Sequence, residues 1–176
     1  MTQPSLTEGM RTLYITRHAK SSWDDPRADD FHRPLNDRGQ RDAPFMAQVF
    51  SSRNEPVDLL MSSTAVRALS TAHLFAKSMG KERSAVQEDR MMYLADLPTL
   101  IKRVEQLPDS AKRVMLFGHN PGLSELVEYL GDADLGEIPT CAIVRIDLPI
   151  DSWTEASMGL GSVVWSDFPK RHKELQ

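Results

Sequence analysis

The chain has 176 residues, enough for one domain with a sizeable core and too few for two. Its 21 Lys and Arg against 25 Asp and Glu give a formal net charge of −4, which argues against nucleic acid or an anionic membrane as a partner. The single cysteine, Cys141, excludes an intramolecular disulfide framework and a multi-cysteine zinc site, and we expect a small buried side chain there. No apolar run is long enough to span a bilayer and no secretory signal is apparent, so we expect a cytoplasmic protein.

Residues 1–10 are polar and predict a flexible lead-in, whereas residues 11–176 alternate short apolar runs with segments of helical periodicity. We expect strands at Leu13–Thr16, Val57–Met61, 85–88, Arg113–Phe117, Ala142–Leu148 and, at an edge of the sheet, Thr154–Met158. We expect helices at Arg38–Ser52, Ser63–Met79, Leu97–Leu107 and Pro121–Leu130. Pro44 predicts a late start or a kink in the first helix, and Gly80 and Gly131 are expected to close the second and fourth helices.

This alternation predicts an α/β fold with three layers, in which a largely parallel central sheet carries helices on both faces. We expect residues 11–176 to form a single domain of this kind. Ligands of such sheets bind beyond the carboxyl ends of the strands, so residues just after strands are the candidates for function. Three basic clusters occupy such positions.

The first basic cluster directly follows the first predicted strand. Arg17 and Lys20 flank His18, and Ser21 and Asp24 follow in the same loop. A neutral imidazole near pH 7 is a competent nucleophile toward phosphorus, and neighbouring cations attract phosphoryl oxygens. The cluster therefore indicates a phosphoryl site, with a solvated loop of surface charges as the alternative.

The second cluster follows the second predicted strand. Ser62 or Ser63 is a suitable N-cap, which places Arg67 in the first turn of the helix. A cation there opposes the helix dipole unless an anion lies between them, and Thr71 and Ser63 at four residues' distance offer no acidic partner. An anion-binding role for Arg67 follows, with an outward-pointing surface arginine as the alternative.

The third cluster is Gly118-His119-Asn120-Pro121, after the strand that ends at Phe117. Asn120 suits the N-cap position and Pro121 the first helical position, so the segment predicts a tight turn from strand to helix. Free amide groups at such a helix start form an anion site. His119 then projects at the end of the strand, where a packing or capping histidine is the alternative.

Together the clusters are expected to place Arg17, His18, Arg67 and His119 around one pocket. Two guanidinium groups would grip phosphoryl oxygens, one imidazole would attack in line and the other would donate a hydrogen bond. No cluster has metal-ligand spacing, so we expect neither a metal nor another cofactor. The cationic side chains would take the place of the usual magnesium.

The three clusters resemble motifs of the histidine phosphatase superfamily, which has the phosphoglycerate mutase-like fold. The matching segments, in the family's order, are Thr-Leu-Tyr-Ile-Thr-Arg17-His18-Ala-Lys-Ser, Ser63-Thr-Ala-Val-Arg67-Ala with Thr71-Ala72, and Gly118-His119-Asn-Pro. The short length, the segment Arg17-His18-Ala-Lys-Ser-Ser-Trp23 and the segment Arg33-Pro-Leu-Asn-Asp-Arg-Gly39 are similar to the SixA-type phosphohistidine phosphatases. The likeness runs from about Leu13 to about Leu148.

The resemblance implies that His18 becomes a phosphohistidine and that Arg17, Arg67 and His119 complete the phosphate pocket. Further candidates for substrate binding are Lys20, Ser21, Asp24 and Asn120. The chain departs from the common pattern at Ala19, where most members have glycine, but the added methyl group is small. Asp24 stands where sugar-phosphate members often have an asparagine, so it would act as a proton donor or contact the substrate.

A general acid is the missing part of the pattern. Sugar-phosphate members use a carboxylate to protonate the departing alkoxide, and here Asp24, Glu88, Asp89 and Asp96 are candidates without a recognisable motif. Imidazole, with a conjugate-acid pKa of about 6.5, leaves phosphorus with little help from an acid. A phosphohistidine substrate would therefore not require a general acid.

We expect a metal-independent phosphatase with a phosphohistidine intermediate, acting on phosphohistidine of a histidine-containing phosphotransfer domain. A small-molecule phosphomonoesterase of the same family is the first alternative, and a non-catalytic phosphate- or phosphohistidine-binding module is the second. A phosphate or sulfate anion should bind in the pocket, and the oligomeric state stays open. Trp23, Phe31 and His32 would either form the rim of an open pocket or pack their loop against the body.

Overall fold

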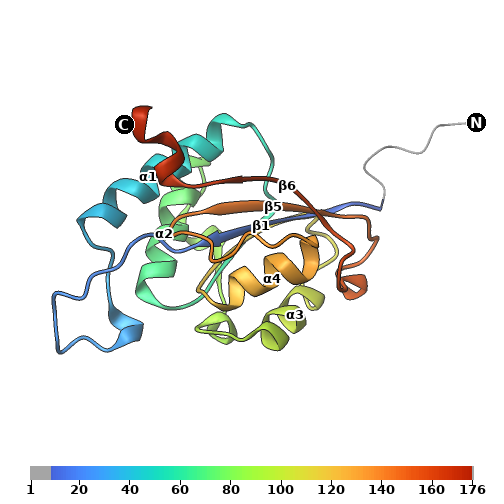
Figure 1. Ribbon diagram of the computed structural model, residues 1–176, viewed down its shortest axis with the longest axis horizontal. Helices are drawn as coiled ribbons and strands as arrows, with labels where there is room; N and C mark the ends of the chain where they lie inside the picture. Colours follow the sequence, from blue (N-terminus) through green and yellow to red (C-terminus); the bar gives the residue numbers. More distant parts are fainter. Residues whose placement is uncertain (1–8, 176) are drawn as a thin grey trace, which may run out of the picture.

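A computed structural model describes residues 9–175 as a six-stranded mixed sheet with helices on both faces (Figure 1). The strands are β1 (Arg11–Arg17), β2 (Leu59–Ser62), β3 (Val86–Glu88), β4 (Arg113–Gly118), β5 (Ile143–Leu148) and β6 (Ser162–Asp167). The helices are α1 (Asp37–Ser52), α2 (Val66–Ser78), α3 (Leu97–Glu105) and α4 (Gly122–Gly131). Short 3₁₀ turns lie at Asp30–His32, Arg83–Ala85, Arg90–Met92, Trp153–Glu155 and Pro169–Leu175.

The sheet has the order β3-β2-β4-β1-β5-β6, and its first four strands are parallel. β5 pairs antiparallel with β1, and β6 pairs antiparallel with β5. Register brings the functional strand ends level, because Arg17 of β1 pairs with Gly118 of β4 and Ser62 of β2 pairs with Phe117. The residues that follow these three strands therefore emerge side by side at one edge of the sheet.

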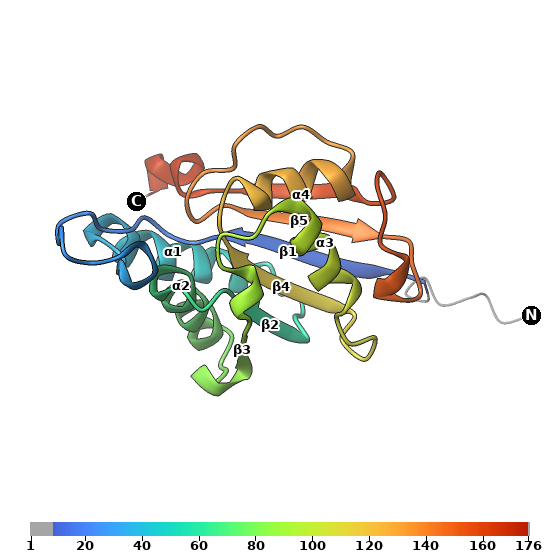
Figure 2. The same cartoon turned by 90° about the horizontal axis from the view of Figure 1, so that it is seen from below.

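Two apolar cores lie on the two faces of the sheet. One contains the buried side chains of α1 and α2, and the other those of α3 and α4. The two views of the ribbon show these helix pairs in separate places against the sheet (Figure 1; Figure 2). Alternate residues of β1 serve the two cores: Leu13 and Ile15 face α3 and α4, whereas Tyr14 faces α1 and α2. The three-layer α/β/α arrangement expected from the sequence is confirmed.

Helix α1 begins at Asp37 with Pro44 in its interior, so of the predicted late start or kink the late start does not occur. Asn36 sets the beginning, because its side chain accepts a hydrogen bond from the Gly39 N–H at 2.8 Å. Gly39 also lets the helix approach the preceding loop closely: a Cβ there would lie 2.0 Å from the Lys20 carbonyl oxygen. The start of α1 thereby holds the loop that follows the first basic cluster.

Helix α2 begins at Val66, three residues later than expected, and neither Ser62 nor Ser63 is its N-cap. Ala65 occupies that position without a side-chain cap, because the Ser63 hydroxyl is engaged by His119 at 2.7 Å. Arg67 nevertheless lies in the first turn, as predicted. Helix α4 ends at Gly131, but the left-handed residue that closes it is Asp132, with φ +48°.

The strand predicted at Thr154–Met158 was wrong. That segment contains a 3₁₀ turn anchored by the buried Trp153, whose indole N–H donates to the Ala111 carbonyl at 2.8 Å. The edge strand is β6, where exposed and partly buried residues precede a buried Asp167, so the strand has no clear apolar pattern. The other predicted strands and α3 match the observed elements to within two residues at each end.

The lead-in predicted for residues 1–10 falls almost wholly on residues 1–8, which lie outside the described residues. The single domain predicted for residues 11–176 stays a prediction. Within residues 9–175, no helix combines the length and apolar character needed to cross a membrane.

Candidate active site

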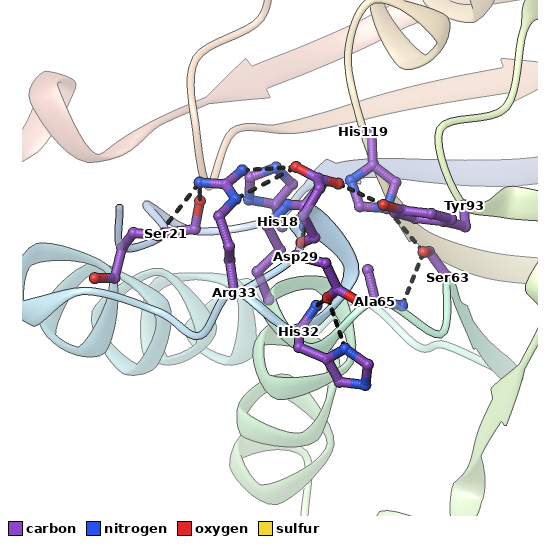
Figure 3. Close-up of polar contacts among 12 residues, drawn as sticks. His18, Ser21, Asp29, His32, Arg33, Ser63, Ala65, Tyr93 and His119 are labelled. Carbon is purple, nitrogen blue, oxygen red and sulfur yellow. Dashed lines mark hydrogen bonds and ion pairs between the residues drawn. The ribbon is translucent and has the colours of Figure 1, made fainter. Parts of the chain in front are cut away.

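The three strand ends meet at a pocket of about 250 Å³. It is lined by Arg17, His18, Lys20, Ser21, Trp23, Asp30, Arg33, Arg67, Leu94, His119, Asn120 and Thr140. Of the eight residues predicted to act in catalysis or substrate binding, only Asp24 is outside this set, and it is exposed. Figure 3 shows Ser63 and Tyr93 beside His119, and Arg33 reaching the Ser21 hydroxyl.

His18 is buried at the end of β1 with one ring nitrogen engaged. Its Nδ1 lies 2.7 Å from the Ala19 carbonyl oxygen, which can only accept, so Nδ1 carries the proton and donates. Nε2 therefore keeps its lone pair. Burial lowers the pKa of His18 to about 3, with smaller contributions from the positive charges of Arg67 and Arg17. The imidazole is neutral at pH 7, as a nucleophile requires.

His119 lies next to His18, with ring centroids 5.3 Å apart. Its Nε2 is 2.7 Å from the Ser63 hydroxyl, which also accepts the Ala65 N–H at 3.2 Å. Burial, with smaller contributions from the nearby His18 and Arg67, lowers the pKa of His119 to about 3. Its Nδ1 is buried without a hydrogen-bond partner among residues 9–175.

Arg17 and Arg67 approach the two histidines from different elements. Arg17 donates to the Ile138 carbonyl at 2.8 Å and lies 3.5 Å from the exposed carboxylate of Glu137. The Nε atoms of both arginines are buried and lack an acceptor within the described chain. Together with His119 Nδ1 they leave three polar nitrogens of pocket-lining side chains unsatisfied, an arrangement that an anion in the pocket would complete.

Four pocket residues were not predicted as site residues from the sequence: Asp30, Arg33, Leu94 and Thr140. Asp30 has the most contacts with the predicted residues. One carboxylate oxygen accepts from Arg67 at 2.9 Å and from the Tyr93 hydroxyl at 2.5 Å, and the other accepts from Arg33 at 3.2 Å. Burial alone would raise the pKa of Asp30, but the hydrogen bonds from Tyr93 and Arg67 outweigh it and bring the pKa to about 2. Asp30 is thus the acidic partner of Arg67 that the helix itself does not offer. Its only sequence signal was its place three residues before Arg33, in a loop rather than at a strand end.

The remaining acidic candidates lie away from the pocket. Glu88 is exposed on β3, and Asp89 is paired with Arg103 at 2.6 Å. Asp96 is the N-cap of α3 and accepts the Thr99 N–H at 3.0 Å. Among the described residues that line the pocket, Asp30 is the one carboxylate.

Two predicted local details are resolved by hydrogen bonds. Asn120 is not the N-cap of α4, since Pro121 takes that position. The Asn120 side chain instead accepts from the Ser124 hydroxyl at 2.8 Å and donates to Ile138 at 2.9 Å. Ala19 is fully buried, and its N–H donates to Thr71 at 3.0 Å, which links the residue after His18 to α2.

Within residues 9–175, no three His, Cys, Asp or Glu side chains are grouped so that they could hold a metal ion. The pocket therefore offers cationic and neutral donors with a single carboxylate. Such a donor set suits a phosphoryl group held directly by protein side chains.

Comparison with known proteins agrees with this geometry. The family model described as the histidine phosphatase superfamily (branch 1) matches residues 13–92. An uncharacterized protein of Mycobacterium tuberculosis (strain ATCC 25618 / H37Rv) is 30% identical over 165 residues, or 88% of this chain and 99% of that protein.

Two solved structures are similar over most of their length. The putative phosphohistidine phosphatase SixA from Agrobacterium tumefaciens has a TM-score of 0.76 and 25% identity, covering 90% of this chain and 98% of that chain. The protein histidine phosphatase SixA complexed with tungstate has a TM-score of 0.78 and 21% identity, covering 92% and 99%. The chain therefore belongs to the histidine phosphatase superfamily, branch 1, and its fold is similar to that of the solved SixA structures.

Proposed function

We propose that this phosphatase removes the phosphoryl group from phosphohistidine on a protein, through a covalent phospho-His18 intermediate and without a metal ion. The observation that carries this function is the state of His18. Its Nδ1–H is held by the Ala19 carbonyl, and its pKa of about 3 leaves Nε2 unprotonated beside two arginines. A nucleophile prepared in this way needs no base to activate it.

The reaction then proceeds in two displacements at phosphorus. The Nε2 lone pair of His18 attacks, the P–N bond to the substrate breaks, and its electron pair goes to the departing ring. That ring leaves as neutral imidazole when its other nitrogen is protonated. Water next attacks phospho-His18, the P–Nε2 bond breaks, and phosphate leaves with both protons of the water.

The side chains around His18 have separate tasks. Arg17 and Arg67 hold phosphoryl oxygens and neutralise the charge that spreads over them. His119 Nδ1 is the remaining nitrogen available to a phosphoryl oxygen, because Nε2 is engaged by Ser63. Lys20, Ser21 and Asn120 line the same pocket and are proposed to bind the substrate. Asp24 is exposed and outside the lining residues, so it is the weakest of the proposed contacts.

The choice of phosphohistidine over a phosphate ester rests on the lack of a placed acid. Among the described lining residues the single carboxylate, Asp30, has a pKa of about 2 and is ionised at pH 7. It has no proton to give to an alkoxide. Imidazole departs with a conjugate-acid pKa of about 6.5 and needs no such donor.

The test is phosphate release from a phosphohistidine-bearing phosphotransfer domain, with EDTA present throughout. Wild type should release phosphate and form an acid-labile phosphoenzyme. His18→Ala should do neither, with a loss of at least about 10⁴-fold. His73→Ala is the matched control, because His73 is on α2 outside the pocket and should keep wild-type activity.

Three other outcomes would contradict the function. Release by His18→Ala would show that another group is the nucleophile. Loss of wild-type activity in EDTA, restored by a divalent ion, would contradict the metal-independent mechanism. Release from p-nitrophenyl phosphate but from no phosphohistidine substrate would assign the protein to small phosphate esters.

A further inference from the structure

Two large apolar side chains border the mouth of the pocket and face solvent. Trp23 is 74% exposed and Leu94 is 54% exposed, although both line the pocket that contains His18. We call these two residues the pocket rim. Exposed apolar surface beside a polar pocket is a feature of interaction sites.

Leu94 is also held in an unfavourable backbone conformation. Its φ is +47°, in the left-handed region that bulky residues rarely occupy. Glycine or asparagine would adopt this conformation at a lower free-energy cost. The leucine side chain is exposed, so burial in the core does not offset that cost. A strained and exposed leucine does not stabilise the fold, which indicates that Leu94 has a functional role.

The pocket rim is connected to the reacting groups. The Arg33 guanidinium stacks on the Trp23 ring, 3.4 Å from its centroid, and the same guanidinium binds Asp30. Asp30 accepts from Tyr93, the residue before Leu94, and the Tyr93 ring lies 5.6 Å from that of His119. A molecule that contacts Trp23 and Leu94 therefore lies over the pocket itself.

We propose that the pocket rim is the docking surface for the protein that carries the phosphohistidine, and that apolar side chains around that phosphohistidine pack on Trp23 and Leu94. This docking role rests on the proposed function. A pocket of about 250 Å³ lies below the usual range for sites that enclose a whole ligand, about 300–1,000 Å³. It admits a phosphoryl group and an imidazole ring, so the rest of a protein substrate must lie outside, against the rim.

The test compares two substrates that share the same scissile P–N bond. One is a phosphohistidine-bearing phosphotransfer domain, and the other is phosphoimidazole, which is too small to reach across the rim. Leu94→Asn and Trp23→Ala should each lower kcat/KM for the protein by about tenfold, and for phosphoimidazole by at most about threefold. Leu94→Asn should also unfold at a temperature no lower than wild type, since asparagine tolerates the left-handed conformation.

Met158→Ala is the matched control, because Met158 is 74% exposed, like Trp23, but does not line the pocket. It should behave as wild type on both substrates. Wild-type kcat/KM for the protein in both rim variants would overturn the docking surface and leave the proposed function standing. Equal losses of kcat/KM on both substrates would also overturn the docking surface, because the rim would then affect the reacting phosphoryl group rather than the rest of the protein substrate. Wild type that hydrolyses phosphoimidazole but not the phosphoprotein would overturn the protein substrate and the docking surface together.

Discussion

The two halves of the pocket are built in different ways. Arg17, His18 and His119 stand at the ends of β1 and β4, where strand register fixes them. Asp30, Arg33 and the pocket rim lie outside the strands, and side-chain contacts join Arg33 to both Asp30 and Trp23. The first half is a rigid frame suited to a reaction common to many substrates, whereas the second half can change without disturbing the sheet. We infer that the strand ends perform the chemistry and the loops select the molecule on which it is performed.

The largest effect on activity is expected at Arg67, which lies in the first turn of α2 and lines the pocket. It tests whether Arg67 belongs with the residues that perform the chemistry or with those that select the substrate. Arg67→Lys keeps the charge but removes the planar guanidinium, whose terminal nitrogens donate to Asp30 and whose Nε–H is left unpaired in the pocket. We expect kcat to fall by about 10²–10³-fold, as for loss of one donor to a developing charge. Pre-steady-state phosphoenzyme formation measures this directly, with Arg83→Lys, outside the pocket, as control. A fall in affinity with normal kcat would place Arg67 with the selecting half of the pocket.

A smaller effect is expected at Asp30, which holds Arg67 and Arg33 but is itself on the loop side. Asp30→Asn removes one negative charge from the pocket, so inorganic phosphate should inhibit more strongly while misplaced arginines lower kcat by about tenfold. Tyr93→Phe removes a single hydrogen bond to the same carboxylate and should lower kcat by about threefold or less. Phosphate inhibition constants and kcat for the two variants check this. Weaker inhibition by phosphate in Asp30→Asn would contradict the electrostatic reason.

The smallest effect concerns stability rather than turnover. Burial lowers the pKa of His18 and of His119 to about 3, below the value of about 6.5 expected in the unfolded chain. Between these values the unfolded chain binds more protons, so stability is full above pH 6.5 and declines as the pH falls. Each histidine should contribute up to about 1.4 kcal/mol per pH unit in that window.

Urea denaturation at pH 7 and pH 5 measures this decline. His119→Gln, which cannot be protonated, should lose less stability than wild type between the two pH values. His32→Gln is the control and should follow wild type closely, because the His32 ring and its partner Asp29 are both exposed. An equal decline in His119→Gln and wild type would show that this histidine is not held neutral.

The same contrast explains what could be predicted from the sequence. Strand ends are marked by apolar runs and by Gly and Pro, so the fold and the meeting of Arg17, His18, Arg67 and His119 followed from local patterns. Asp30 has no such mark, because its place in the pocket depends on the path of a loop. The β6 edge strand was missed for a related reason, since half-buried strands lack a clear apolar pattern.

Cys141, predicted to be buried, is fully enclosed at the edge of the sheet where the pocket lies. Its N–H donates to the carbonyl oxygens of Arg17 and His18, and burial raises the pKa of its thiol well above the usual range. A thiol reagent can therefore reach Cys141 only when the backbone behind His18 opens. The rate of its modification measures how often the catalytic edge of the sheet opens in the native protein, and a bound phosphate analogue should slow that rate.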